Sequence, residues 1–262
     1  MTGTNYAEAL RLRGRVVAAI MLRDIRTRYG GIRWNYVISI LWPLSHLVGM
    51  VIAFTFVNRL IPFGTDSVVF ISTGALPYVL CLYPARMSAQ AFFQGRQLLA
   101  FPVIQPMDVI LARVVLEALT ASLVGTLFCI GLWAFGFDLM PQDLPTALTG
   151  VYAAIFLGIS LGVFTITLTS IFGIPGYLFM ILSMIVLYMT SGVYMPMYGS
   201  TEQTRFWISM NPLVHLVEWV RSGYFEMHTP VELDRKYVVG LAAFLLFGGL
   251  AGERLFRGKI MR

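Results

Sequence analysis

Long apolar stretches separated by short polar segments run through the whole chain. A helix that crosses a membrane needs about 20 mostly apolar residues, and six stretches approach this length. They are residues 36–57, 68–87, 109–135, 148–172, 174–193 and 237–252. Only Gly173–Gly176, with the sequence GIPG, separates the fourth from the fifth, and a proline between glycines favours a tight turn between antiparallel helices. The pattern therefore predicts an all-α integral membrane protein with six transmembrane helices.

The composition and the placement of charge agree with this class. Hydrophobic residues make up 58% of the chain and charged residues 12%, which is more apolar than a soluble domain of 262 residues requires. In a membrane protein, Lys and Arg mark the loops that remain in the cytoplasm. Fourteen of the nineteen lie before residue 36, between residues 86 and 113, or after residue 253. We therefore expect both termini and the loop after the second span inside, and residues 58–67, 136–147 and 194–236 outside.

The segment before the first span, residues 7–29, predicts an amphipathic helix. Apolar residues share about half of its circumference: Leu10, Val16, Val17, Ala19, Ile20, Met21 and Ile25. Arginines 11, 15, 23 and 26 occupy the rest, so we expect a helix that lies in the membrane interface. Arg13, Asp24 and Arg28 interrupt the apolar face. Asp24 and Arg28 have the spacing and order of a favourable helical ion pair, and the alternative is that this polar spot contacts protein.

The long outer segment, residues 194–225, does not contain a seventh span. Its apolar pieces, residues 206–210 and 212–220, are too short to cross a membrane. They predict short amphipathic or re-entrant helices at the outer face, and Pro212 is well placed at a helix start after Asn211.

A search for catalytic or metal chemistry finds no convergent set of residues. Ser160, in the sequence GISLG, matches a nucleophile-elbow pattern, but it falls in the middle of a span instead of at a strand-to-helix turn. Gly158 and Gly162 are more typical of close helix packing, as are Gly248 and Gly252. The three histidines are scattered, which predicts no metal site. The C-terminal GERLFRGKIMR lacks the spacing of a phosphate-binding loop, so we expect no nucleotide or other cofactor in this chain.

Polar and aromatic residues within the spans allow more than one interpretation. Arg113 and Glu117 are four residues apart, and we favour a structural ion pair. His46 either lines a pathway or forms a hydrogen bond across helices, and we favour the second. Aromatic residues gather toward the span ends, either as an interfacial belt or as a surface on which sugars stack. They are Trp34, Tyr36, Trp42, Tyr78, Tyr83, Tyr188 and Tyr194.

Three blocks in order along the chain carry a family resemblance. They are RDIRTRYGGIRWNYVISILWPLSHL from Arg23, GRQLLAFPVIQPMDVILARVVLE from Gly95, and NPLVHLVEWVR from Asn211. The sequence resembles the membrane subunit of ABC type-2 exporters, specifically the capsular polysaccharide export permease (KpsM-type). The resemblance implies one ABC type-2 transmembrane domain over residues 1–262. Within it, residues 1–34 form a cytoplasmic interface segment, 36–193 spans one to five, 194–236 a periplasmic gate region, and 237–262 the sixth span and cytoplasmic tail.

The resemblance also implies the partners. A homodimer of this non-enzymatic chain is expected with two copies of a cytoplasmic ATPase (KpsT-type), which uses ATP and Mg²⁺. A polysaccharide co-polymerase (KpsE-type) and an outer-membrane exporter follow in the periplasm. The expected cargo is a lipid-linked polysaccharide, the location is the bacterial inner membrane, and no nucleic acid is involved.

Three sets of residues are candidates for these roles. The resemblance implies the ATPase-contacting set and the gate, whereas the substrate pathway rests on His46 and the aromatic residues near the span ends, for which an interfacial belt is the alternative. The ATPase-contacting set is Arg23, Asp24, Arg26 and Arg28 of the interface helix, with Gln94, Gly95, Arg96, Leu98, Leu99, Phe101 and Pro102 of the coupling region. The substrate pathway is Trp34, Tyr36, Trp42, His46, Tyr83, Tyr188 and Tyr194. The periplasmic gate is Asn211, Pro212, His215, Glu218 and Arg221. Arg59, Arg205 and Arg221 either hold an acidic polymer at the outer side or are solvated loop charges.

Two other functions remain open. The first is an exporter of O-antigen or teichoic acid, which differs mainly in the polymer carried. The second, from a different class, is a membrane enzyme that acts on lipid-linked sugars, which needs a convergent catalytic set.

Overall fold

A computed structural model describes residues 6–27, 34–57, 66–91, 95–193, 201–225 and 232–260. Within these ranges the regular structure is helical, which confirms the all-α prediction. The helices are α1 (Tyr6–Thr27), α2 (Asn35–Val57), α3 (Ser67–Ala89), the 3₁₀ helix η2 (Arg96–Ala100), α5 (Pro106–Ala134), α6 (Leu144–Phe172), α7 (Ile174–Met189), α8 (Glu202–Ser209), α9 (Pro212–Tyr224) and α10 (Arg235–Ile260).

Among the described residues, five helices are long and apolar enough to cross a membrane: α2, α3, α5, α6 and α10. The predicted fifth span, residues 174–193, forms only the 16-residue helix α7. At 1.5 Å per residue its length is about 24 Å, against a hydrocarbon thickness of about 30 Å. The helix ends early because the chain turns after Met189, and Gly192 adopts a φ of 70°. The expected six spans are thus five long helices and one short one.

The turn predicted at Gly173–Gly176 is confirmed. Helix α6 ends at Phe172, and Gly173 follows it with a φ of 69°, a left-handed conformation that glycine adopts without steric cost. Helix α7 then begins at Ile174, with Pro175 in its first turn, and packs against α6.

Helix α6 is the centre of the packing and contacts α3, α9, α10 and α7. A Cβ atom at Gly158 or Gly162 would overlap the backbone of α3 near Cys81 and Ala85, so these glycines permit the close approach predicted for them. In α10 the close contacts are made by Gly249 and Gly252 against α6. Gly248, which the sequence pattern predicted, lies only at ordinary contact distance from Phe164. The prediction is therefore confirmed for Gly252, while Gly249 takes the place of Gly248.

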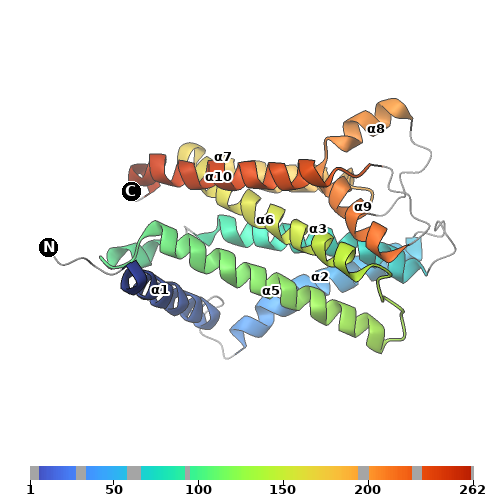
Figure 1. Ribbon diagram of the computed structural model, residues 1–262, viewed down its shortest axis with the longest axis horizontal. Coiled ribbons are helices and arrows are strands. Elements are labelled where there is room, and N and C mark those ends of the chain that lie inside the picture. Colours follow the sequence, from blue (N-terminus) through green and yellow to red (C-terminus); the bar gives the residue numbers. More distant parts are fainter. Residues whose placement is uncertain are drawn as a thin grey trace.

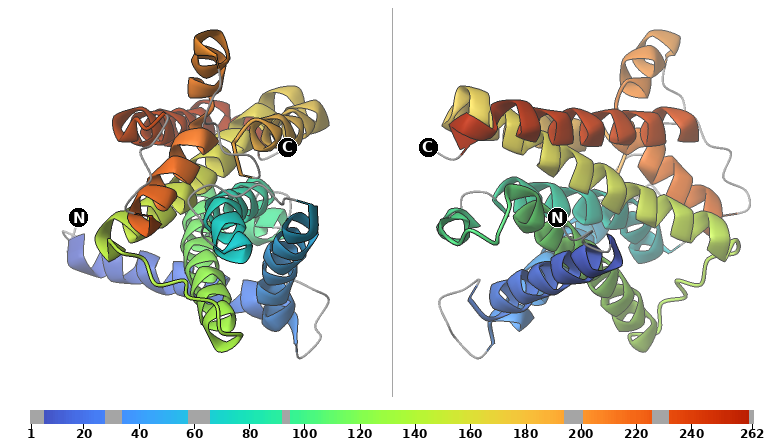
Figure 2. Two further views of the ribbon diagram at one scale, coloured as in Figure 1. Left: turned by 90° about the vertical axis from the view of Figure 1, so that its right-hand side faces the viewer. Right: turned by 60° about the vertical axis from the view of Figure 1, so that its left-hand side comes forward.

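The spans form an elongated bundle with different structures at its two ends (Figure 1). One end carries α1, η2 and the C-terminal turns of α10, and we call it the α1 end. The other carries α8 and α9, and we call it the α9 end. Helix α1 lies across the bundle, beneath α5 and beside the start of α2 (Figure 2). The apolar core runs between the spans and includes Leu47, Ile71, Leu80, Leu157 and Leu216.

Candidate functional site

Helix α1 packs on the first turns of α5 through one stripe of residues. Arg13, Val17, Ile20 and Asp24 are spaced by four, three and four positions, which places them on one side of a helix. Ile20 is only 3% exposed and packs with Leu98, Val109 and Ala112. The amphipathic helix is confirmed, but much of its apolar face contacts protein.

An ion pair with α5 lies at each end of this stripe. Arg13 Nη1 lies 2.7 Å from Asp108 Oδ2, and Arg113 Nη2 lies 3.2 Å from Asp24 Oδ2. The alternative for Asp24, contact with protein, is therefore confirmed. Its suggested helical partner Arg28 lies outside the described residues. Arg113 Nη1 is also 3.8 Å from Glu117 Oε1, in agreement with the predicted structural pair.

The sequence did not single out the role of Arg13 or Asp108. The signal was present, because Arg13 and Asp24 are charged residues on the same stripe as Val17 and Ile20. Charges that recur on the apolar side of an amphipathic helix indicate partners of opposite sign on a neighbouring element.

The exposed side of α1 carries basic residues. Arg11, Arg15 and Arg26 are exposed, and Arg23 is partly exposed. Of the four residues in and after α1 predicted to contact an ATPase, Arg23 and Arg26 reach the surface, Asp24 is buried against α5, and Arg28 lies outside the described residues.

The coupling region, residues 95–105 of the described chain, combines buried and exposed apolar side chains. Gly95 is buried, with no room for a Cβ atom beside Val109, and Leu98 is buried in the contact with α1. The turn that follows η2 exposes an apolar tip of Phe101, Pro102 and Val103, with Phe101 60% exposed. Leu99 is half-buried and Arg96 begins η2, while Gln94 lies outside the described residues.

Part of the predicted substrate pathway comes together beside α2. Trp42, His46 and Tyr83 line a groove of about 550 Å³ with Ser45, Met50 and Phe54. The Tyr83 hydroxyl lies 3.3 Å from His46 Nδ1, so His46 forms the favoured hydrogen bond across helices and lines the groove as well. The rings of His46 and Tyr78 meet edge to face at 6.4 Å, and Tyr78 stacks on Tyr188 of α7 at 3.9 Å.

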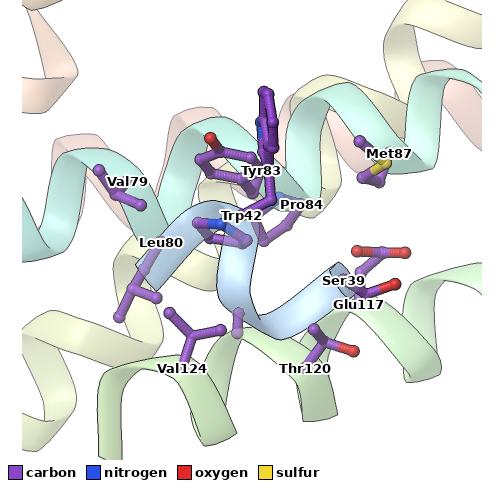
Figure 3. A pocket seen from close by; sticks show the side chains of 12 residues that line it. Ser39, Trp42, Val79, Leu80, Tyr83, Pro84, Met87, Glu117, Thr120 and Val124 are labelled. Atoms are coloured by element: carbon purple, nitrogen blue, oxygen red, sulfur yellow. The ribbon is translucent and has the colours of Figure 1, made fainter. Parts of the chain in front are cut away.

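The other predicted pathway residues lie elsewhere. Trp34 is exposed just before α2, and the Tyr36 hydroxyl lies 3.2 Å from Thr120 Oγ1 of α5. Tyr194 is outside the described residues. Trp42 and Tyr83 also border a small cavity of about 20 Å³, where Ser39, Glu117 and Thr120 provide polar groups (Figure 3).

The predicted helix start at Asn211 and Pro212 is confirmed, but α9 is a buried helix. Asn211 Oδ1 accepts the Leu213 N–H at 2.8 Å, and Asn211 Nδ2 donates to the Leu187 carbonyl at 2.6 Å. His215 is bound on both sides of its ring. Nδ1 accepts the Asp234 N–H at 3.1 Å, so Nε2 carries the proton and donates to the Ser209 carbonyl at 2.8 Å.

Arg221 attaches the last turn of α9 to the segment that follows α7. It is 1% exposed, and its guanidinium donates to the carbonyls of Gly192 at 2.9 Å and Val193 at 2.8 Å. The same group lies over the Phe70 ring at 4.0 Å and 3.9 Å from Glu218 Oε1. Arg221 is therefore not a solvated loop charge, and in this conformation it is not exposed to a polymer. Arg59 lies outside the described residues, and Arg205 is partly exposed on α8.

The α9 end is also joined to the start of α6. The Asp143 N–H donates to the Gly223 carbonyl at 2.9 Å, and the Asp143 carboxylate caps α6 by accepting from Thr146. These bonds from the Thr146 hydroxyl and N–H lower the pKa of Asp143, because they stabilise its charged form.

Ser160 does not have the geometry of a nucleophile. It is buried within α6, and its hydroxyl donates to the Phe156 carbonyl at 2.7 Å. This contact within the helix favours the packing interpretation of the GISLG segment.

Comparison with known proteins agrees with this architecture. No family model matches the chain. The chain is 28% identical over 243 residues to the polysialic acid transport protein KpsM of Escherichia coli, covering 90% of this chain and 91% of that protein. It is 26% identical to the capsule polysaccharide export inner-membrane protein CtrC of Neisseria meningitidis serogroup B, covering 95% and 93%. The predicted resemblance to capsule polysaccharide exporters is confirmed.

A third relative extends this result. The chain is 25% identical over 257 residues to the capsule polysaccharide export inner-membrane protein BexB of Haemophilus influenzae, which covers 97% of this chain and 96% of that protein. Because the matches cover most of both partners, the likeness is not confined to one segment.

Proposed function

We propose that this chain is the permease subunit of an exporter that moves capsular polysaccharide across the bacterial inner membrane. The observation that carries the proposal is the similarity, over 90% of the chain or more, to the polysialic acid transport protein of one organism and the capsule polysaccharide export proteins of two others. Five long apolar helices fit a subunit that spans the membrane.

The α1 end faces the cytoplasm in this proposal. The exposed arginines of α1 support this orientation, because positive charge is retained on the cytoplasmic side and suits anionic lipid headgroups. The apolar tip at Phe101 and Val103 then projects toward the cytoplasm, where it docks on a separate ATPase that binds ATP and Mg²⁺. The apolar side chains of this turn are exposed outside the spans, and docking on the ATPase removes them from water.

The exported polymer passes along the α2 face between two copies of this chain. Helix α2 exposes Leu41, Trp42, Val48, Ile52 and Phe56, which suits contact with a second copy or with lipid. The groove of Trp42, His46 and Tyr83 supplies aromatic faces on which sugar rings stack. The cargo is lipid-linked, and a co-polymerase and an outer-membrane exporter receive it beyond the α9 end.

Deletion of the gene tests the transport function. Polysaccharide of the capsule should accumulate in the cytoplasm of the deletion strain and be absent from the cell surface. A normal surface capsule in that strain would refute the function.

Substitution of the exposed tip tests the docking site separately. Phe101→Glu should abolish ATPase activity that depends on this chain and reduce recovery of the ATPase with the purified permease. Met140→Glu is the matched control, since Met140 is an exposed apolar loop residue at the α9 end. Leu98 is unsuitable because it is buried, and a charge there would disturb the fold. Normal ATPase binding by Phe101→Glu would overturn the docking site alone.

A further inference from the structure

Two ion pairs attach α1 to α5 at well-separated points. Arg13 and Asp24 are eleven residues apart, which is about 16 Å along a helix. Their partners Asp108 and Arg113 are five residues apart, about 7.5 Å along α5. The two helices cross (Figure 2), and the long arginine side chains bridge the difference between the two spacings. A single contact would leave α1 free to rotate about the point where it crosses α5, whereas two separated contacts restrict this rotation.

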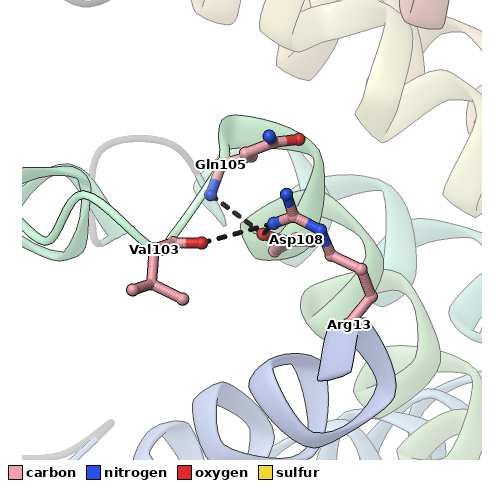
Figure 4. Close-up of polar contacts among 4 residues, drawn as sticks. All are labelled: Arg13, Val103, Gln105 and Asp108. Carbon is pink, nitrogen blue, oxygen red and sulfur yellow. Dashed lines mark hydrogen bonds and ion pairs between the residues drawn. The ribbon is translucent and has the colours of Figure 1, made fainter. Parts of the chain in front are cut away.

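The first of these pairs also holds the coupling region. Arg13 Nη1 donates to the Val103 carbonyl at 3.3 Å as well as to Asp108 Oδ2 (Figure 4). The same Asp108 oxygen accepts the Gln105 N–H at 2.9 Å. One guanidinium and one carboxylate therefore connect α1, the exposed tip and the first turn of α5. Asp108 is favourably placed for this, because an acidic residue in the first turn of a helix is stabilised by its N–H groups.

The two side chains of this pair differ in burial. The Asp108 side chain is 5% exposed, but the Arg13 side chain is 42% exposed. Water screens the exposed guanidinium, which limits the stabilisation from the pair, and the buried carboxylate keeps its hydrogen bond from the Gln105 N–H when Arg13 is removed. The directional bonds of the pair can still fix the position of a turn.

We propose that Arg13 is a positioning residue that ties the tip at Val103 to α1 and α5. When the tip is displaced, α1 and α5 then move with it, because the turn after η2 cannot bend independently of them. This inference rests on the proposed function, because it assumes that the tip receives its displacement from an ATPase. It assigns to α1 a mechanical role within this chain that is distinct from contact with the ATPase.

Arg11 provides a matched control on the same helix. It is the same residue type two positions away, and it is exposed on the side of α1 that faces away from α5. Arg11→Gln and Arg13→Gln remove the same charge from the same helix. Only Arg13→Gln also removes the contacts with Val103 and Asp108.

The experiment measures polysaccharide moved per ATP hydrolysed, with permease and ATPase reconstituted together in vesicles. Arg13→Gln should bind the ATPase normally and hydrolyse ATP, but transport per ATP should fall roughly 5-fold or more, the lower range of typical coupling effects. Arg11→Gln should transport as the wild type does. Arg13→Gln combined with Asp108→Asn should be no worse than the more impaired single variant, because both changes remove one shared contact.

Two results would overturn the inference. One is an equal transport per ATP for Arg13→Gln and Arg11→Gln. The other is a loss of transport by Arg13→Gln that is fully explained by a smaller amount of assembled complex, with the polysaccharide moved per ATP unchanged. That result would indicate a purely structural contact. Failure of the wild-type complex to move polysaccharide would instead refute the proposed function.

Discussion

Replacement of Arg221 by methionine should destabilise the α9 end strongly. Methionine keeps much of the side-chain volume but removes the donors to the Gly192 and Val193 carbonyls. Each hydrogen bond from a charged donor contributes about 1.5–3 kcal/mol. The change also removes the charge beside Glu218, which is 3% exposed, and breaking a buried ion pair costs about 3–5 kcal/mol. Since these contributions overlap, we expect a total loss of about 3–5 kcal/mol.

Thermal unfolding of the purified chain in detergent, followed by circular dichroism, measures this loss. For a chain of this size each kcal/mol lowers the Tm by about 2–4 °C, so the Arg221→Met variant should melt roughly 6–20 °C below the wild type. Arg205→Met on the neighbouring α8 is the control and should change the Tm little. Adding Glu218→Gln to Arg221→Met should recover part of the loss, because it removes the buried negative charge. A Tm for Arg221→Met equal to that of the control would refute the reasoning.

Two further predictions concern packing and the α1 contact. Gly158→Ala should lower the free energy of unfolding by about 1–3 kcal/mol, because the added Cβ atom overlaps α3. Gly131→Ala is the control and should be neutral or slightly stabilising, since a Cβ atom there meets nothing within 4 Å. Equal Tm values for the two variants would contradict the close contact. In the same assay, Asp24→Asn should lower the Tm less than Arg113→Met does. Asp24→Asn leaves Arg113 paired with Glu117 at 3.8 Å, whereas Arg113→Met removes the arginine that both carboxylates share. The reverse order would contradict the shared arrangement.

The sequence predicted the features that depend on local pattern. Apolar length located the spans, proline between glycines located the turn before α7, and Asn211 with Pro212 located the start of α9. Small residues four apart indicated that α6 packs closely on a neighbouring helix. These signals act within one helix or one turn, so they can be recognised without knowledge of the neighbours.

The features that the sequence missed depend on partners distant in the chain. Asp24 suggested a partner four residues away, but its partner Arg113 is brought close only by the crossing of α1 and α5. Arg221 suggested a solvated charge because it lies outside the long spans, although its side chain reaches the carbonyls of the segment that follows α7. Gly248 and Gly249 are neighbours in a glycine-rich helix, and only the packing of α10 decides which one faces α6.

The two short helices at the α9 end differ in their attachment. Helix α9 is held at its start by Asn211, in its first turn by the bond of His215 to Asp234 and in its last turn by Arg221, whereas α8 buries none of its residues and projects from the bundle (Figure 1). Movement of α8 therefore uncovers no core, although it breaks the hydrogen bond between His215 and the Ser209 carbonyl, whereas displacement of α9 also breaks contacts with α7 and exposes buried side chains. Widening this end therefore costs less free energy when α8 moves away from α9 than when α9 leaves α7.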